Sequence, residues 1–309
     1  MRGKVSQIMA DFAPACCGDV SHAPNPMKIP FALLALLPLA LLPKVSASVL
    51  YGVTSSNQLV TVDTAAPSTF LSTASISGLV ASDGVTPDPF AGIVNLAYNY
   101  NDGQIYGLDS NSNFYRIGTN GSTTLLSSSF SPNGFDAGLG FDPFSGNFVY
   151  GSDVAEQFNL SSTGTITAGA DFVYGAGDVN AATTPSLFGV AFDPDFGTAW
   201  FVDANLDTLS MSLDPGLGEL LTVGGLGTDV TSFGDLTVDF QGNLYATLST
   251  DGLTSSLYAI NSANGAASLI GGYGAGEGRD LVTLAVPEPS AALLGGLGML
   301  ALLRRRRCA

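Results

Sequence analysis

A strand-turn-strand-turn-strand pattern recurs along this chain and limits the folds that it can adopt. Short runs of aromatic, β-branched and Leu residues alternate with clusters of Gly, Asn and Asp, which is typical of short strands joined by tight turns. The pairs Asn120-Gly121 and Asn264-Gly265 favour tight turns because both residue types adopt positive φ. The pattern occupies residues 50–71, 105–126, 148–168, 199–223 and 244–270.

A further short apolar strand precedes four of these five units, so the complete unit has four strands. These leading strands lie within residues 95–103, 138–146, 189–197 and 235–242. Each leading strand is followed by an Asn or Asp, and successive residues of this set lie about 43 to 51 positions apart. This period is typical of β-propeller blades.

The first and last units are incomplete and complement each other. Residues 50–71 lack a leading strand, whereas residues 279–286 form a leading strand with no unit after it. Pairing them completes a fifth blade and leaves no open sheet edge. The sequence therefore predicts an all-β domain over residues 48–285, a propeller-like ring of five four-stranded blades. A β-sandwich or a β-solenoid is the competing architecture, although solenoid repeats are shorter and leave no complementary halves.

The charge and residue usage of this domain exclude several partners and chemistries. The whole chain has 26 acidic and 10 basic residues, and within 48–285 the basic residues are Arg116 and Arg279. Such an anionic surface argues against binding to nucleic acid or anionic membranes. The span contains no Cys, His or Lys. Disulfides, thiol or histidine-based catalysis, His or Cys zinc sites and Lys-containing phosphate loops are thereby excluded.

The C-terminal residues 286–307 combine a Pro-Glu-Pro segment, an apolar run from Ser290 to Leu303 and four arginines. Proline fixes φ and lacks an N–H, so the first segment should be extended. A helix of 14 residues spans about 21 Å, which is less than the roughly 30 Å of bilayer hydrocarbon. Arginines that snorkel close part of this gap and keep the C-terminus cytoplasmic. We expect a short transmembrane helix with the body outside.

This arrangement resembles the PEP-CTERM sorting signal of Gram-negative bacteria. The resemblance implies recognition and processing by an exosortase, usually in species that secrete exopolysaccharide. The alternative is an ordinary C-terminal membrane anchor, since a buried core helix would not end in four arginines. The residues implicated in sorting and processing are Val286, Pro287, Glu288, Pro289, Ser290, Arg304, Arg305, Arg306 and Arg307.

Residues 27–47 predict a secretory signal peptide with a short apolar helix. A lysine precedes an apolar run, and the modest side chains of Val45 and Ala47 place cleavage between Ala47 and Ser48. Export through the Sec machinery follows from this segment. Residues 1–26 fit no structural pattern, so we expect Met27 to be the true start, the alternative being an unusually long N-terminal region of the signal peptide.

The body also resembles a propeller-like domain of unknown function found in exported bacterial proteins. The repeats carry this resemblance together with residues 172–192, 201–209 and 221–230, and it covers most of 48–285. It implies the fold but brings no established activity or site. The chain departs from the pattern in lacking basic residues in its third repeat and in an insertion at 77–93.

Four polar residues make up the main candidate site, and Ca²⁺ is the one cofactor considered for it. Each directly follows a leading strand and opens a turn, so in a propeller all four lie on one face near the channel mouth. Carboxylate and amide oxygens are the ligands that Ca²⁺ prefers. The competing and preferred interpretation is that they hydrogen-bond their own backbone as Asx-turns. They are Asn99, Asp142, Asp193 and Asp239.

A second, weaker pattern is the alternation of Asp109, Asn111 and Asn113. It matches the first half of a calcium-binding loop, but Phe114 stands where the loop needs glycine and the distal glutamate is missing. A solvated hairpin turn explains these residues equally well.

These observations favour a non-catalytic exported protein with a structural or adhesive role in the exopolysaccharide or surface layer. It would first be anchored to the inner membrane with its body in the periplasm. An anionic body would need divalent cations to bridge it to an anionic polysaccharide. The alternatives are a Ca²⁺- or small-ligand-binding propeller and a carboxylate-dependent glycosidase or lyase. The last would use Asp193 with Asp195, or Asp203 with Asp207, which surface turns also explain.

Overall fold

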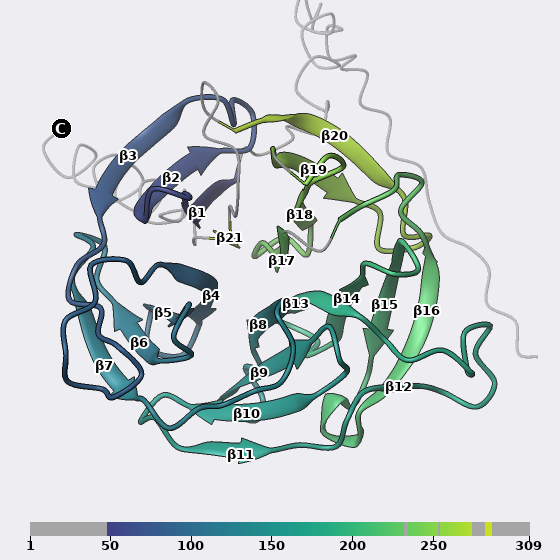
Figure 1. The fold of residues 1–309 in the computed structure, drawn as a ribbon. Coiled ribbons are helices and arrows are strands. Elements are labelled where there is room, and N and C mark those ends of the chain that lie inside the picture. Colours follow the sequence, from purple (N-terminus) through teal and green to yellow (C-terminus); the bar gives the residue numbers. More distant parts are fainter. Residues whose placement is uncertain (1–47, 232–233, 253, 274–281, 286–309) are drawn as a thin grey trace, which may run out of the picture. The chain divides into compact units, whose positions relative to one another are not determined.

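The computed structural model describes residues 48–231, 234–252, 254–273 and 282–285 of the 309-residue chain. They form five sheets arranged as blades around a common axis, so the predicted all-β, five-bladed propeller is confirmed (Figure 1). The short apolar helices predicted at the two termini lie outside these residues. Within the described ranges, no helix has the length and apolar character needed to cross a bilayer.

Each blade is an antiparallel meander whose first strand lies nearest the axis (Figure 1). Blade A contains β21 (Val282–Ala285), β1 (Val49–Val53), β2 (Gln58–Asp63) and β3 (Phe70–Ser75). Blade B contains β4 (Ile93–Asn99), β5 (Gln104–Asp109), β6 (Phe114–Ile117) and β7 (Thr123–Ser127). Blade C contains β8 (Ala137–Phe141), β9 (Asn147–Ser152), β10 (Gln157–Ser161) and β11 (Ile166–Ala168). Blade D contains β13 (Leu187–Phe192), β14 (Ala199–Asp203), β15 (Thr208–Ser212) and β16 (Glu219–Gly225). Blade E contains β17 (Gly234–Val238), β18 (Leu244–Leu248), β19 (Ser256–Ile260) and β20 (Ala267–Gly272).

The ring is closed by the two ends of the propeller, as the complementary half-units predicted. Strand β21 pairs antiparallel with β1 in a register that runs from Leu50↔Ala285 to Val53↔Val282. The C-terminal strand therefore supplies the inner strand of the blade whose other three strands begin the domain. This pairing removes the open edges that an unclosed ring would expose.

Blade D carries one strand that the sequence pattern did not predict. Strand β12 (Val173–Tyr174) pairs in parallel with the outer strand β16, with Tyr174 opposite Leu220. A single turn of 3₁₀ helix, η3 (Pro215–Leu217), precedes β16, and the Pro215 carbonyl accepts a hydrogen bond from the buried Gln157 side chain of blade C. The extra strand thus extends blade D at its outer edge.

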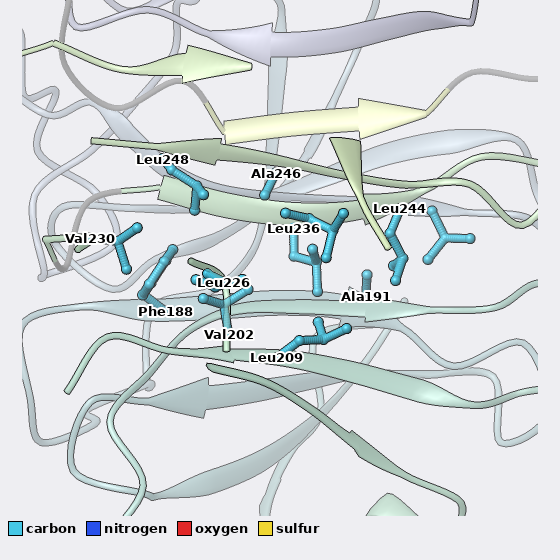
Figure 2. Packing of buried hydrophobic residues seen from close by; sticks show 12 residues of the cluster. Phe188, Ala191, Val202, Leu209, Leu226, Val230, Leu236, Leu244, Ala246 and Leu248 are labelled. Carbon is cyan, nitrogen blue, oxygen red and sulfur yellow. The ribbon is translucent and has the colours of Figure 1, made fainter. Parts of the chain in front are cut away.

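The hydrophobic core is divided among the interfaces between neighbouring blades. Five clusters of buried side chains lie between blades A and B, B and C, C and D, D and E, and E and A. In the cluster between blades D and E, Phe188 and Val202 face Leu236 and Leu248 (Figure 2). Trp200, the single tryptophan, packs against the same cluster. Burial between blades therefore holds the ring together.

Glycines in the inner strands allow the blades to converge at the axis. A Cβ on Gly138 of β8 would lie 2.4 Å from the backbone N of Val190 in β13. A Cβ on Gly189 of β13 would lie 2.9 Å from the Cβ of Leu236 in β17. Because real Cβ atoms do not approach other atoms this closely, a side chain at either position would push adjacent inner strands apart.

Candidate functional site

The turns that follow the inner strands meet on one face, as predicted for the four candidate residues. Contacts between blades show this directly. The Ser48 hydroxyl, at the start of blade A, donates a 2.7 Å hydrogen bond to Asp239 Oδ2 of blade E. The Tyr100 ring of blade B lies 5.2 Å from Phe240 of blade E and 6.2 Å from Phe141 of blade C. We call this surface the exit face and define it as residues 99–103, 142–146, 193–197 and 239–242 together with Ser48 and Ala285.

The four candidate residues all form Asx-turns within their own loops. Asn99 Oδ1 accepts hydrogen bonds from the N–H groups of residues 101 and 102, and Asp142 Oδ1 accepts one from residue 144. Asp193 Oδ1 accepts bonds from residues 195 and 196, and Asp239 Oδ1 from residues 241 and 243. These bonds account for Asn or Asp at each turn without a metal ion. The described ranges contain no group of three or more His, Cys, Asp or Glu side chains arranged to hold a metal. The Ca²⁺ site stays a prediction.

Asp239 is buried, as Asn99 is, and differs from the other three because it also binds another blade. Its exposed fraction is 1%, and its Oδ2 accepts hydrogen bonds from the Ser48 hydroxyl and from Asn243 Nδ2. Ser48 is itself buried, and its backbone N donates to Thr64 Oγ1. Ser48, which is predicted to be the first residue after signal-peptide cleavage, is thus fixed by hydrogen bonds to blades A and E.

The inner strands of blades B, C, D and E enclose a cavity of about 20 Å³, too little for more than one water molecule. At the exit face Tyr100 covers it, and the hydroxyl donates to the Val238 carbonyl across the ring at 3.4 Å. Burial, and secondarily the nearby carboxylates of Asp193 and Asp239, raise the pKa of this phenol. The structure therefore brings Tyr100, Asp193 and Asp239 together, an association that the repeat pattern did not reveal.

The Asp109-Asn111-Asn113 segment forms a turn at the opposite face that satisfies its own oxygens. Asp109 Oδ1 accepts from the backbone N–H groups of Asn111 and Asn113, and Oδ2 accepts from Asn113 Nδ2 and the Tyr115 hydroxyl. Burial raises the pKa of Asp109, while these donors lower it. Asn111 and Asn113 also bind the Val80 carbonyl, so the turn anchors the insertion at 77–93.

The same polar cap recurs in every blade at the turn between the second and third strands. In each case the last residue of the second strand, or the one after it, accepts hydrogen bonds from N–H groups further along the turn. The sequence analysis missed this repeat because the capping residue varies between Ser, Thr and Asp. The caps are Thr54, Asp109, Ser152, Asp203 and Ser249.

The proposed catalytic pairs are engaged in the same kinds of local contact. Asp195 donates its N–H to Asp193, and Asp203 accepts bonds from the Tyr174 hydroxyl and the backbone of residues 186, 205 and 206. Asp207 Oδ1 accepts the Val230 N–H at 2.8 Å. These bonds position turns, and they give no indication of an acid and a base prepared for catalysis.

A hollow of about 360 Å³ opens between blades B and C on the side of the ring where the inner strands begin. We call that side the pocket face. Polar residues Asn95, Asp109 and Asp136 line the hollow together with Phe130 and Tyr150. Phe135 stands at its edge with its side chain fully exposed. A volume of this size accommodates a small ligand or a short stretch of a polymer. The sequence analysis missed this site; its signal is the aromatic- and proline-containing loop at 128–136.

Comparisons with known proteins place two family models on this chain. A model described as a domain of unknown function (DUF4394) matches residues 58–285, and a model of the PEP-CTERM protein-sorting motif matches residues 285–307. A comparison with curated proteins finds no match. The domain match covers the propeller from β2 to β21, and the motif match begins at the last residue of β21.

Several solved structures are similar in fold. A nidogen/laminin complex matches with a TM-score of 0.48 and 16% identity, covering 74% of this chain and 79% of the other. Virginiamycin B lyase from Staphylococcus aureus gives 0.42 and 13%, covering 80% and 83%. TolB from Acinetobacter baumannii gives 0.43 and 12%, covering 74% of this chain and 53% of the other.

Proposed function

Because this chain belongs to the DUF4394 family of domains of unknown function, and its propeller leads directly into a sorting motif, we propose that it is a non-catalytic structural protein of the cell envelope. In this proposal the pocket face contacts extracellular polysaccharide, and the exit face is directed toward the cell while the C-terminal segment anchors the chain.

The C-terminal motif supports the location. A PEP-CTERM motif marks an exported protein that is anchored in the membrane and then processed by an exosortase in the cell envelope. In our proposal the signal peptide at 27–47 delivers the chain through the Sec machinery and the body enters the periplasm. Processing at the Pro-Glu-Pro segment then releases the propeller into the surface or exopolysaccharide layer.

The composition and packing of the propeller support a non-catalytic role. The span 48–285 has no His, Cys or Lys, so it offers no histidine base, thiolate or amine for catalysis. The cavity enclosed by the inner strands of blades B to E holds only about 20 Å³, and Tyr100 lines it and bonds to the Val238 carbonyl across the ring. At the exit face, Asp193 and Asp239 accept hydrogen bonds from their own turns.

The pocket face supplies the surface for a polysaccharide. Phe135 is fully exposed beside a hollow that is lined by Asn95, Asp109 and Asp136. An exposed phenyl ring packs against the apolar face of a sugar, and the amide and carboxylate groups bind hydroxyls. Because the body is anionic, contact with an acidic polysaccharide requires divalent cations between the two.

Binding to an acidic polysaccharide of known composition tests this proposal. The full chain is passed over immobilised alginate in Ca²⁺ and again in EGTA. We expect retention that EGTA abolishes and that Phe135→Ser reduces about fivefold. The matched control is Phe196→Ser, which removes an exposed phenyl ring from the exit face. Failure of the wild-type chain to bind, or a larger loss with Phe196→Ser than with Phe135→Ser, contradicts the proposal.

The 360 Å³ hollow also favours a second function, the binding of a free small ligand such as an oligosaccharide. Calorimetric titration with alginate trimers separates the two functions. Saturable binding of the trimers without retention on the polymer would favour the small-ligand function over the structural one.

A further inference from the structure

Both ends of the propeller leave the ring on the exit face. Strand β21 ends at Ala285, which pairs with Leu50 near the start of β1. In blade E, β17 ends at Val238, which pairs with Leu244 at the start of β18. Ala285 therefore occupies in blade A the position that Val238 occupies in blade E, where the Asp239 turn follows directly. The hydrogen bond between Ser48 and Asp239 places the other end of the domain at the same edge.

The exit face also presents phenyl rings to solvent from three successive blades. The exposed fractions are 71% for Phe144, 82% for Phe196 and 38% for Phe240. These side chains lie in the turns of blades C, D and E. Phe144 is held in place by blade D, because its ring lies over Gly197. A Cβ added at Gly197 would come within 2.5 Å of a carbon of that ring. A set of exposed aromatic rings on one face marks an interaction surface.

The covalent length of the chain decides what this surface meets. Only residues 286–289 separate Ala285 from the apolar run that begins at Ser290. The five steps from Ala285 to Ser290 reach at most about 18 Å even when fully extended. The lipid headgroup layer on one side of a bilayer is about 5–8 Å thick. With the apolar run in the hydrocarbon, the exit face at Ala285 therefore lies within the headgroup layer or no more than about 10–13 Å outside it.

We infer that the exit face is a membrane-contacting surface, and that Phe144, Phe196 and Phe240 enter the lipid headgroup layer while the C-terminal segment is inserted. This inference rests on the proposed function, because it requires the tail to act as a membrane anchor. Aromatic side chains are favoured at this depth of the bilayer. The contact holds the ring with its pocket face directed away from the membrane.

Charge selects the lipid. The carboxylates of Asp142, Asp193 and Asp195 lie in the same turns as the exposed rings. Like charges repel, so the exit face prefers zwitterionic headgroups such as phosphatidylcholine or phosphatidylethanolamine to anionic phosphatidylglycerol.

Quenching of tryptophan fluorescence by brominated lipids measures the contact. The full chain, with Trp200→Phe to remove the single native tryptophan, is reconstituted in phosphatidylcholine vesicles whose acyl chains carry bromine near the headgroup. Phe196→Trp and Phe144→Trp report on the exit face. Phe135→Trp is the matched control, because that side chain is fully exposed on the pocket face. Circular dichroism confirms that each variant is folded.

We expect brominated lipid to reduce the fluorescence of the Phe196→Trp and Phe144→Trp variants by about half and that of Phe135→Trp by less than about a tenth. Replacing half of the lipid by phosphatidylglycerol should weaken the effect. A chain that stays with the vesicles after a carbonate wash but shows no quenching at position 196 overturns the inference and leaves the anchor intact. Equal quenching at positions 135 and 196 overturns it as well. A chain that washes off overturns the anchoring premise. In a separate arm, a crosslinker is placed at position 196 and the chain is reconstituted together with an exosortase. Crosslinking to the exosortase, with no quenching in lipid alone, overturns the inference and shows that the exit face binds the enzyme and not the lipid.

Discussion

Asp239 allows the turn-forming and metal-binding interpretations of the candidate residues to be separated by substitution. Its carboxylate is 1% exposed and accepts four hydrogen bonds, two from backbone N–H groups at 2.8 and 2.9 Å and two from the side chains of Ser48 and Asn243 at 2.7 and 2.8 Å. Asp239→Ala leaves these donors without a partner. A buried donor left unpaired costs about 1–3 kcal/mol, and because such losses are not additive we expect about 3–5 kcal/mol in total.

Two further substitutions make the argument quantitative. Asp239→Asn keeps an oxygen for the two backbone N–H groups, as Asn99 does at the same position of blade B, and its NH₂ group can donate to the Ser48 hydroxyl, but it loses the bond from Asn243 Nδ2, which then faces another donor. We expect it to cost about 1–3 kcal/mol. Asp142→Ala removes one N–H bond, at 2.9 Å, from a half-buried side chain, and should cost about 0.5–1 kcal/mol.

Urea unfolding followed by circular dichroism gives these free energies. The expected order of loss is Asp239→Ala, then Asp239→Asn, then Asp142→Ala, with an unchanged dependence of the free energy on urea. The reasoning is refuted if Asp142→Ala costs as much as Asp239→Ala, because the two carboxylates would then be equivalent members of one site. It is also refuted if Asp239→Asn costs as much as Asp239→Ala.

Three more predictions follow from the packing and the buried charges. Phe148→Ala should lower the free energy of unfolding by about 4 kcal/mol, because the centroid of this fully buried ring lies 4.6 to 5.4 Å from those of Tyr106, Phe141 and Phe114. A loss below about 1 kcal/mol in urea unfolding would contradict the packing between blades B and C. Burial raises the pKa of Asp235 well above its usual range, so the native state keeps this proton where the unfolded state has lost it. Stability should therefore fall as pH rises above about 4, by up to about 1.4 kcal/mol per pH unit, and Asp235→Asn should remove that slope in urea unfolding at pH 4 to 7. Finally, EGTA should leave the melting temperature unchanged, since the exit-face carboxylates are satisfied by their own turns; a rise in melting temperature with added Ca²⁺ would establish the metal site.

The strand order and the closure of the ring could be predicted because they depend on local patterns. Period, turn residues and the two complementary half-units are all visible along the sequence, and they fix which strands pair. Strand β12 was missed because two residues in parallel pairing produce no alternation and no turn signal. It forms only because blade D brings β16 alongside residues 173 and 174.

The candidate site was predicted in position but not in detail. The pattern placed four polar residues on one face, yet it could not show that Asp239 is buried against Ser48 or that Tyr100 bonds to the Val238 carbonyl across the ring. Those contacts join residues 191 and 138 positions apart, and they depend on the angle between blades. The pocket face was missed for a similar reason, since its hollow is formed by loops from two blades that share no motif.

The pairing of β21 with β1 is the central claim, because it closes the ring and places both chain ends on the exit face. Tyr51 lies directly opposite Leu284, and opposed residues in antiparallel strands have Cα atoms about 4.5–5.5 Å apart, within the range of a disulfide. With Cys16, Cys17 and Cys308 changed to Ser, Tyr51→Cys and Leu284→Cys should form a disulfide on mild oxidation, seen as a reducible shift in gel mobility. The control combines Leu284→Cys with Thr124→Cys on the outer strand of blade B, and it should form none. No crosslink in the first pair, or equal crosslinking in both, would contradict the closed ring.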